Sequence, residues 1–535
     1  MKTIDAKMLR GWIEDGQELA ILDAREEGEF GASHLFWSIP CPLSRAEIRA
    51  PALLPRRSTR IVCTDDSEDA TGRLAEKLAA YLESIGCTDV AVLAGGTKGW
   101  EAAGYVLFSG VNVPSKAFGE WVEHHYGTES VDAPELKEWI DSGRDMVVLD
   151  SRTAEEFARM TIPTAISVPG GELAYRIGDL VPSPDTLVVV NCAGRTRSIM
   201  GAESLRQTGI PNKVVALRNG TMGWELAGLT CDHGRTDKFI PNKPQTAAEA
   251  LRRASAFADA SGVRVIRAGE LARFEMDPHR TLYVLDVRDP AEFRTGYRPG
   301  SRNAPGGQLV QATDTWIGVR GARIVLLCDT GVRARMSAAW LRQMGHHDVF
   351  VVAGGLDALR GSTLAPAPAP APVVSDQAAS ATIDAAGLAG LLETPGTVVV
   401  DLARSIEHRD GHIQGAIWGI RTRLSALGER LAAAKQVVVA ASDATLAALA
   451  AAELRGLTTA EVRVLDGGTA AWKAAGHALA KDRTNPADKD CVDFYLRPYD
   501  RNSGVEAAMH AYLSWEIDLA QEIVRDGTVH FGVGH

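Results

Sequence analysis

The chain has 535 residues, of which 45% are apolar and 23% charged, and its 57 Lys and Arg against 68 Asp and Glu give a net charge of −11. This composition is ordinary for a globular protein, and at about 150 residues per domain the length predicts three or four domains. The acidic balance argues against a nucleic-acid partner, and the chain has no apolar run near the roughly 20 residues of a membrane span, so we expect no membrane partner.

Four copies of one opening segment follow each other along the chain. Each is a short apolar strand ending in Asp, then Arg, then an acidic helix start. The aspartates lie 127, 136 and 115 residues apart, a period that is too long for a solenoid and predicts a tandem array of whole domains. The openings are Ile21-Leu-Asp23-Ala-Arg25, Val148-Leu-Asp150-Ser-Arg152, Val284-Leu-Asp286-Val-Arg288 and Val399-Val-Asp401-Leu-Ala-Arg404.

Each copy also closes in the same way, with a strand followed by a glycine-rich turn, and a Trp follows the turn in three copies. The second copy shows best what lies between opening and closing. Met146–Leu149, Leu187–Val190 and Val214–Leu217 are apolar, largely β-branched runs, and Ser198–Gln207 before Gly209 is a helix candidate. This alternation predicts four doubly wound α/β domains with parallel sheets, whose ligands bind at the carboxyl ends of the strands. The closing turns are Gly95-Gly96, Asn219-Gly220, Gly354-Gly355 and Gly467-Gly468.

Composition places the linkers between these domains. Ala365–Pro372 alternates Ala and Pro and predicts a stiff spacer between the third and fourth domains, and Pro241–Pro244 separates the second from the third. The domains that we predict are residues 1–110, 125–236, 245–364 and 377–480, followed by a C-terminal extension, 481–535.

The C-terminal extension begins with an aromatic stretch, Cys491–Tyr499, and continues into a helix candidate, Val505–Arg525, ended by Gly527. Its apolar positions have roughly helical spacing. We expect this helix to pack on the body of the protein, and a dimer arm that makes a homodimer is the alternative.

The residues that follow the central strand differ among the four domains. Cys192 stands there in the second domain and Cys328 in the third, while Ala441 replaces the cysteine in the fourth. The first domain has Cys63, followed by an acidic loop that contains Asp65, Asp66, Glu68 and Asp69. Acidic neighbours disfavour a thiolate, so we expect Cys63 to be inert.

Taken together, the Asp-x-Arg opening, the strand–Cys–loop–helix centre and the Gly-Gly-x-x-Gly-Trp closing resemble rhodanese domains. The resemblance covers about 90% of the chain, leaving out the tail, and is nearest to four-domain rhodanese-related sulfurtransferases. It implies a nucleophilic cysteine at the start of the active-site loop that takes sulfur from a donor such as thiosulfate as a persulfide. A thiol or cyanide would be the acceptor.

The residues of the loop after Cys192 favour the role of nucleophile independently of the resemblance. We expect loop N–H groups and a helix amino terminus to point at the Cys192 sulfur as an amide cradle. Together with the cations Arg195 and Arg197 they favour a thiolate, which is the nucleophile, and also suit an anionic donor. Cys328 has Arg333 at the same spacing, so we expect both cysteines to be catalytic. The substrate-binding residues that we predict are Ala193, Gly194, Arg195, Thr196, Arg197 and Ser198 in the second domain and Gly331 and Arg333 in the third.

Other functions fit less well or stay open. Four residues separate Cys192 from Arg197, one fewer than in the related phosphatases, and the shorter loop fits a sulfur atom better than a phosphoryl group. A 3-mercaptopyruvate-type reaction at Cys328 remains an alternative, because Gly331-Val332 in its loop resembles that group. A largely non-catalytic scaffold or sulfur-carrier-binding protein also remains open, because the first and fourth domains lack the active loop.

Cofactors and a secreted location are not expected. The chain has seven cysteines and no CxxC pair, which argues against a disulfide scaffold or zinc ribbon and predicts a reducing cytoplasm. The histidine pairs at 124–125 and 346–347 have no further metal ligand at a suitable spacing, and the Gly-Gly turns lack the Lys-Ser/Thr of a phosphate-binding loop. The amino terminus does not resemble a signal peptide.

Overall fold

The computed structural model describes residues 2–66, 73–237, 243–359 and 381–532. The predicted spacer Ala365–Pro372, part of the Pro241–Pro244 linker, and the acidic residues Glu68 and Asp69 lie outside these ranges.

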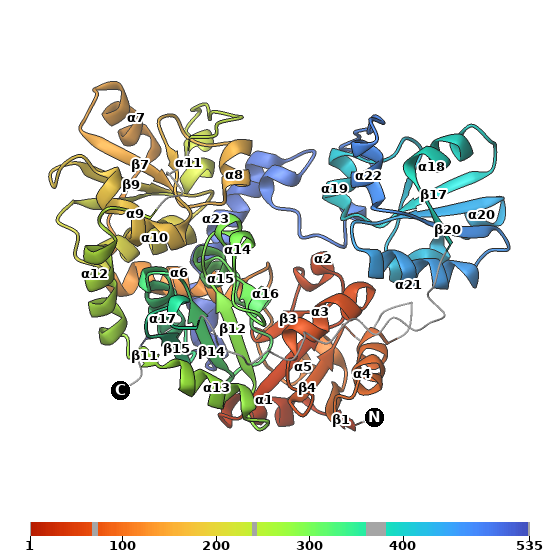
Figure 1. Ribbon diagram of the computed structural model, residues 1–535, viewed down its shortest axis with the longest axis horizontal. Coiled ribbons are helices and arrows are strands. Elements are labelled where there is room, and N and C mark those ends of the chain that lie inside the picture. Colours follow the sequence, from red (N-terminus) through yellow and green to blue (C-terminus); the bar gives the residue numbers. More distant parts are fainter. Residues whose placement is uncertain (1, 67–72, 238–242, 360–380, 533–535) are drawn as a thin grey trace.

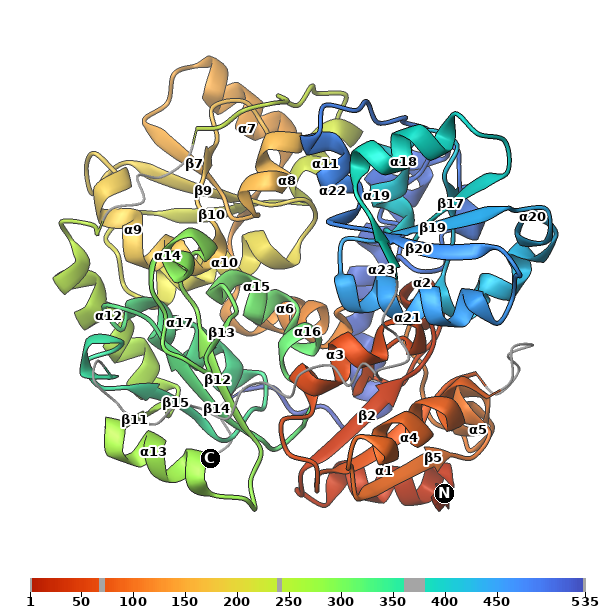
Figure 2. The ribbon, with the colours of Figure 1, turned by 45° about the vertical axis from the view of Figure 1, so that its right-hand side comes forward.

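Within the described residues the chain forms four five-stranded sheets, each with its own set of flanking helices (Figures 1 and 2). The strand order is the same in every sheet: β1-β5-β4-β2-β3 in the first corresponds to β6-β10-β9-β7-β8 in the second, β11-β15-β14-β12-β13 in the third and β16-β20-β19-β17-β18 in the fourth. All of these pairings are parallel. The predicted fold class, four parallel α/β domains, is therefore confirmed.

The first two domains contain the following elements. In the first they are β1 (Lys2–Ile4), α1 (Ala6–Glu14), β2 (Leu19–Asp23), α2 (Glu27–Phe30), β3 (Ser38–Pro40), η1 (Leu43–Arg45), α3 (Ala46–Leu53), β4 (Arg60–Thr64), α4 (Leu74–Ser84), β5 (Asp89–Leu93) and α5 (Gly96–Ala102). After α6 (Val113–Tyr126), the second has β6 (Ser130–Val131), α7 (Ala133–Asp141), β7 (Met146–Asp150), α8 (Ala154–Arg159), β8 (Ile166–Ser167), η2 (Gly170–Glu172), α9 (Leu173–Leu180), β9 (Leu187–Asn191), α10 (Thr196–Gln207), β10 (Val214–Leu217) and α11 (Gly220–Leu226).

The other two domains repeat this plan. After α12 (Ala247–Ala260), the third has β11 (Arg264–Ile266), α13 (Ala268–Met276), β12 (Leu282–Asp286), α14 (Pro290–Thr295), β13 (Arg302–Asn303), α15 (Gly306–Gln311), α16 (Thr313–Trp316), β14 (Arg323–Leu327), α17 (Val332–Gln343), β15 (Val349–Val352) and η3 (Asp357–Leu359). The fourth has β16 (Ala381–Ile383), α18 (Ala385–Leu392), β17 (Thr397–Asp401), α19 (Ser405–Asp410), β18 (Ile417–Trp418), η5 (Arg421–Leu427), α20 (Gly428–Ala432), β19 (Gln436–Ala440), α21 (Ala444–Arg455), β20 (Glu461–Leu465) and α22 (Gly468–Ala474). The C-terminal extension, called the tail below, contains η6 (Asp488–Asp490), η7 (Pro498–Asp500) and α23 (Val505–Asp526).

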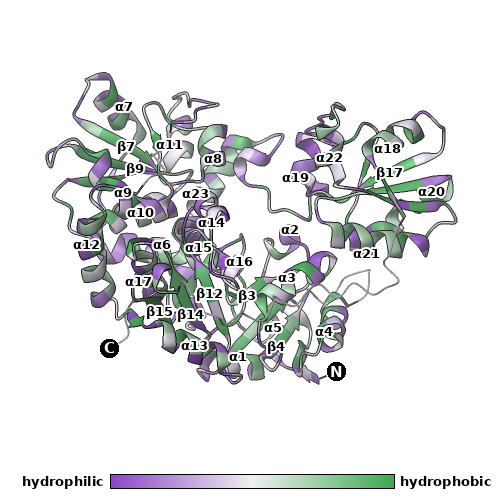
Figure 3. Ribbon diagram, in the orientation of Figure 1, coloured by the Kyte–Doolittle hydropathy of each residue, from purple (hydrophilic) through white to green (hydrophobic). Residues whose placement is uncertain are grey.

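Helices cover both faces of each sheet, so the central strands are buried and have to be apolar. The hydropathy colouring shows these apolar strands (Figure 3). All five residues of β9 are buried. The three strands and the helix predicted in the second domain match β7, β9, β10 and α10, with differences of at most two residues at their ends.

Helices also join the second and third domains. α12 packs on α17, and α6 packs on α10. The rings of Phe118 of α6 and Trp340 of α17 meet edge to face with their centroids 6.1 Å apart, and Trp340 Nε1 donates to Ser204 Oγ at 2.9 Å. The helices α10 and α17, which follow Cys192 and Cys328, therefore share one continuous core.

The tail leaves the fourth domain and returns to the second, where α23 lies against α6 (Figure 1). The predicted helix is present, and Gly527 ends it in the left-handed conformation at φ 70°. The expected packing on the body of the same chain is thus found, and dimerisation through the tail stays a prediction.

Candidate active site

The register of the sheets identifies the same loop position in all four domains. The opening aspartate pairs with the last residue of the central strand, so the next residue occupies the predicted nucleophile position. By this register Cys63 lies two residues too early, inside β4, and Asp65 takes the position in the first domain. The register pairs are Asp23 with Thr64, Asp150 with Asn191, Asp286 with Leu327 and Asp401 with Ala440, which places Asp65, Cys192, Cys328 and Ala441 at equivalent points.

Cys63 is enclosed by the core of the first domain. Its side chain is fully buried, and burial, followed by the neighbouring thiols Cys41 and Cys87, raises its pKa well above the ordinary value. An apolar, enclosed thiol is a poor nucleophile. Cys63 therefore has the surroundings of a structural residue.

The Asp-x-Arg opening forms a buried ion pair beneath the active-site loop. Arg152 Nε and Nη2 donate to the two carboxylate oxygens of Asp150 at 2.9 and 2.7 Å, and Nη2 also donates to the carbonyl of Met160. The first and third domains have the same pair. The ion pair joins the carboxyl end of the strand to the loop that follows the next helix. Each of the two charges can be buried because the other compensates it.

The fourth domain departs from this pattern. Its arginine, Arg404, stands one residue later, and Asp401 instead lies 2.6 Å from Nδ1 of His408, which is fully buried. With Ala441 at the nucleophile position and a different partner on the aspartate, this domain lacks both parts of the predicted site.

Cys192 lies at the floor of the loop between β9 and α10 and is 1% exposed. Its thiol points toward the carbonyl of Arg195 at 3.8 Å and the hydroxyl of Ser198 at 3.5 Å. In the described contacts its sulfur accepts no backbone N–H. The expected amide cradle is therefore not found around the Cys192 thiol. The Ser198 hydroxyl donates to the carbonyl of Arg195 at 2.8 Å and not to the sulfur.

Arg195 is held by two glutamates of α6. Its Nε and Nη2 donate to the two carboxylate oxygens of Glu120, both at 2.8 Å, and Nη2 also meets Glu123. Burial by itself would lower the pKa of Arg195, but the two carboxylates raise it above the ordinary value. Its charge is therefore largely neutralised, and the linker helix α6 fixes the loop.

Arg197 is paired in the same way, with a residue of its own domain. Nη1 and Nη2 donate to Glu156 at 2.7 and 2.8 Å. Burial would raise the pKa of Glu156, but Arg197 holds it below the ordinary value. Glu156 also caps the first turn of α8, so Arg197 joins the loop to that helix.

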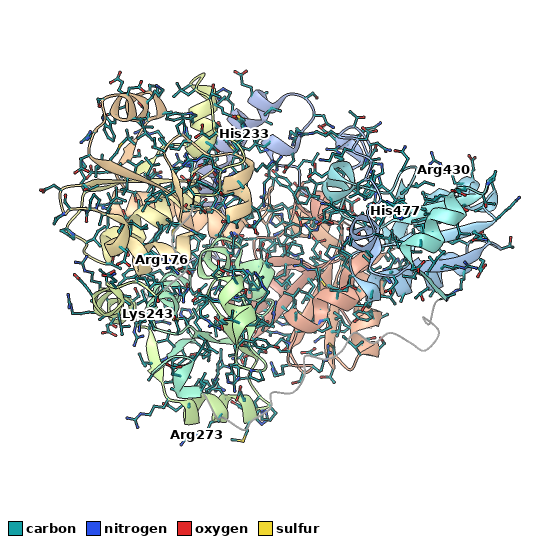
Figure 4. All side chains as sticks on the ribbon, turned by 45° about the horizontal axis from the view of Figure 1, so that its top comes forward. Arg176, His233, Lys243, Arg273, Arg430 and His477 are labelled. Carbon is teal, nitrogen blue, oxygen red and sulfur yellow. The ribbon has the colours of Figure 1, made fainter. Side chains whose placement is uncertain are left out.

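Cys192 opens into a cavity of about 530 Å³ between the second domain and the tail. Ala193, Gly194, Arg195, Thr196 and Arg197 line it, whereas Ser198 lies behind the loop. His233 is at the edge of the second domain beside the tail (Figure 4). The tail contributes Arg483, Tyr495, Arg497, Tyr499, Asp500, Val505, Tyr512 and Glu516, and α6 and the third domain add Lys116 and Gln311.

The tail touches the loop at Gly194. A β-carbon placed on Gly194 would lie 3.1 Å from Oε2 of Glu516 and 3.2 Å from the ring of Tyr512, tighter than most side chains tolerate. Glu516 Oε1 accepts from Thr196 Oγ1 and from Nζ of Lys116, each at 3.0 Å. The small residue at 194 thus permits α23 to close over the loop.

Cys328 shows the anion cradle that was expected at Cys192. Its sulfur accepts the N–H groups of Gly331 at 3.1 Å and Ala334 at 3.4 Å. Gly331 is in the left-handed region, φ 86°, which the turn into α17 requires. Burial raises the pKa of Cys328, and Arg333 opposes that rise.

Arg333 is more heavily neutralised than its counterpart Arg197. It is fully buried and paired with Glu172 at 2.7 Å, with Glu292 at 2.9 Å and with Asp329 at 2.8 Å. Tyr175 covers it, with the guanidinium carbon 4.6 Å from the ring centroid. Cys328 does not line the Cys192 cavity or the three other cavities found among the described residues.

The contact between the second and third domains explains this difference. η2 and α15 are equivalent segments that pack against each other. Glu172 and Tyr175 reach from the second domain to Arg333, whereas Gln311, the counterpart of Tyr175, reaches from the third domain to the Cys192 cavity. The smaller side chain of Gln311 leaves the Cys192 cavity open, whereas Glu172 and Tyr175 cover Arg333 and close the loop after Cys328.

Some residues of the site, both around the loop and in the cavity, were not predicted from the sequence. The glutamates of α6 and the tail residues carry no motif, and they lie far along the chain from Cys192. The one available signal was the aromatic stretch Cys491–Tyr499, because tyrosine and arginine together are frequent in binding surfaces.

Two searches of the described residues had negative results. No group of three or more His, Cys, Asp or Glu is arranged to hold a metal ion. None of the helices described there combines the length and apolar character needed to cross a membrane.

Comparisons with known proteins agree on one family. The model of the rhodanese-like domain matches residues 5–103, 132–227, 268–362 and 384–475, well over half of the chain. A crystal structure of a thiosulfate sulfurtransferase from Pseudomonas aeruginosa is 43% identical, covers 100% of both chains and superposes with a TM-score of 0.90. A sulfurtransferase of Allochromatium vinosum is 29% identical over 99 residues, 18% of this chain and 90% of its own length. A shorter thiosulfate sulfurtransferase of Pseudomonas aeruginosa is 32% identical over 80 residues, 14% of this chain and 68% of its own length.

Proposed function

The chain belongs to the rhodanese-like domain family, and we propose that it is a sulfurtransferase that carries sulfur on Cys192. The donor is thiosulfate or a similar sulfane-sulfur anion, and the acceptor is a thiol or cyanide. The observation that carries this proposal is the placement of Cys192 at the floor of a 530 Å³ cavity, at the start of a helix and among arginines. The similarity to thiosulfate sulfurtransferases supports the choice of donor.

In the first half-reaction the thiolate of Cys192 attacks the outer sulfur of thiosulfate. The S–S bond of thiosulfate breaks, sulfite leaves with the electron pair, and Cys192 becomes a persulfide anion. The amino terminus of α10, whose first N–H groups have no partner within the helix, carries a partial positive charge that favours the negative charge of the persulfide beside it. The Ser198 hydroxyl, 3.5 Å from the sulfur, turns to donate to the anion once the thiol proton has left.

In the second half-reaction a thiolate or cyanide attacks the outer sulfur of the persulfide. The S–S bond to Cys192 breaks and the cysteine returns as a thiolate, so no external oxidant or reductant is needed. Arg197 and Arg195 act mainly by fixing the loop, since glutamates already neutralise them. All seven cysteines are free, which suits a reducing compartment.

Mass spectrometry after incubation with thiosulfate tests the proposal. The wild-type protein gains the mass of one sulfur atom, and peptide mapping locates it on Cys192. Cys192→Ser removes the sulfur from this position and nearly all transfer to cyanide, whereas the matched variant Cys63→Ser keeps both. Full transfer activity in Cys192→Ser would overturn the assignment.

Cys328 is a second candidate sulfur carrier. The observation that favours it is the pair of N–H groups aimed at its sulfur, which stabilises an anion there. Its closed surroundings predict slower loading than at Cys192, and 3-mercaptopyruvate is the alternative donor. If Cys328→Ser alters no rate with thiosulfate or 3-mercaptopyruvate, the third domain is structural.

A further inference from the structure

The cations that face the Cys192 cavity fall into two groups. In the first group, Arg195, Arg197 and Lys116 each form an ion pair with a glutamate, and Arg152 and Arg159 each form one with an aspartate. Arg483 and Arg497, both from the tail, are exposed cavity residues that form no ion pair in the described part of the chain, although Arg497 is near enough to Glu156 to help lower the pKa of that carboxyl. The tail therefore supplies the positive charge that is still available to a ligand.

The acids that line the cavity do not cancel this charge. Glu156 and Glu516 are engaged with Arg197 and Lys116, and Asp500 pairs with Arg159. Glu225 forms no ion pair with Lys or Arg in the described contacts, and burial raises its pKa, while Tyr499 and His233 oppose that rise. A ligand entering this space meets a net positive rim.

The cavity is much larger than the proposed donor needs. Thiosulfate and cyanide have only a few atoms, whereas the cavity of about 530 Å³ is within the range of roughly 300–1,000 Å³ of sites for drug-sized ligands. Three tyrosines of the tail, Tyr495, Tyr499 and Tyr512, supply broad, rigid walls. Because Cys192 is 1% exposed, the larger reaction partner has to insert into this space to reach the sulfur.

We propose that the tail forms an acceptor subsite over Cys192, in which Arg497, assisted by Arg483, binds the carboxylate groups of a small anionic thiol. The proposal rests on the persulfide chemistry at Cys192 and deepens it by naming the acceptor class. The bound thiolate attacks the outer sulfur of the persulfide, the S–S bond to Cys192 breaks, and the product leaves as an anionic persulfide of the acceptor. Arg497 and Arg483 are specificity residues, which hold the acceptor and take no proton or sulfur.

The test separates acceptor binding from sulfur loading. Protein is first loaded with thiosulfate and freed of donor, and mass spectrometry records the persulfide. Single-turnover discharge is then measured with glutathione, which carries two carboxylates, and with neutral 2-mercaptoethanol. The readout is the ratio of the two second-order rate constants, which cancels changes in the cysteine itself.

We expect Arg497→Gln to lower the glutathione to 2-mercaptoethanol ratio about tenfold, the loss of one charge-assisted hydrogen bond. Arg483→Gln lowers it less, and the double variant lowers it most. The matched control is Arg501→Gln, an exposed arginine of the same tail that does not line the cavity, and it keeps the wild-type ratio. High salt lowers the wild-type ratio and has less effect on Arg497→Gln.

An unchanged ratio in the Arg483/Arg497 double variant overturns the acceptor subsite even when loading proceeds normally. Equal loss with both thiols also overturns it, because it assigns Arg497 to the loop and not to the acceptor. Absence of a persulfide in the wild-type protein is a different failure: it refutes the proposed function before any acceptor is added.

Discussion

The ion pair between Arg195 and Glu120 gives a direct measure of how firmly α6 holds the active-site loop. Both side chains are buried, 9% and 1% exposed, and they are joined by two hydrogen bonds of 2.8 Å. Arg195→Met leaves Glu120 buried without its cation. Removing one member of a buried pair costs about 3–5 kcal/mol, so the local opening of α6 and α10 becomes at least roughly a hundredfold more frequent.

The stability lost in Arg195→Met depends on pH in a direction that follows from the pKa of Glu120. Burial raises the pKa of Glu120 and Arg195 opposes that rise, so removing Arg195 raises the pKa further. A carboxyl whose folded-state pKa is raised costs stability when ionised, and the cost disappears when the pH falls below the ordinary value and both states are protonated. The deficit of Arg195→Met is therefore larger at pH 8 than at pH 5.

Hydrogen exchange of α6 and α10 peptides measures this opening without requiring the whole multidomain chain to unfold in one step. Glu120→Gln in the Arg195→Met background recovers a large part of the loss, because no unpaired charge remains. Glu123→Gln, whose carboxylate is 24% exposed, is the matched control and costs less than Glu120→Gln. Additive effects of Arg195→Met and Glu120→Gln, or an equal deficit at both pH values, would refute the reasoning.

Two further predictions concern other parts of the molecule. Glu26, 4% exposed at the contact of the first and fourth domains, has its pKa raised to about 7 by burial, so its ionisation costs stability as the pH rises from about 4.5 through 7. Glu26→Gln should stabilise the protein at pH 8 by up to about 3 kcal/mol and have little effect at pH 4.5, and thermal melts that shift equally at both pH values would contradict this. Iodoacetamide should alkylate Cys192 faster than Cys328, because Cys192 lines the large cavity and Cys328 is enclosed; peptide mapping of partly alkylated protein decides, and the reverse order would place the open site in the third domain.

Local sequence determined the fold of each domain and the position of two of its loops. Runs such as Leu187–Val190 have to be buried on both faces, and a parallel sheet with helices on each side meets that requirement. The repeated opening and closing segments then defined the four domains, and Cys192 and Cys328 were recognisable because each directly follows such a strand. The sequence placed Cys63 after the central strand because spacing leaves the register of β4 open, and the pairing of Asp23 with Thr64 places Asp65 there instead.

Tertiary structure decided which charges remain available at the site. The sequence placed Arg195 and Arg197 beside Cys192 and so predicted a cationic loop, but Glu120 and Glu156 neutralise them after folding. Electrostatic interactions depend on distance in space, and glutamates far along the chain approach within hydrogen-bonding distance only when α6 packs on α10. For the same reason the tail, which carries no motif of the family, covers the cavity beside Cys192, which lies 305 residues before Arg497 in the chain, and contributes Arg497 to it.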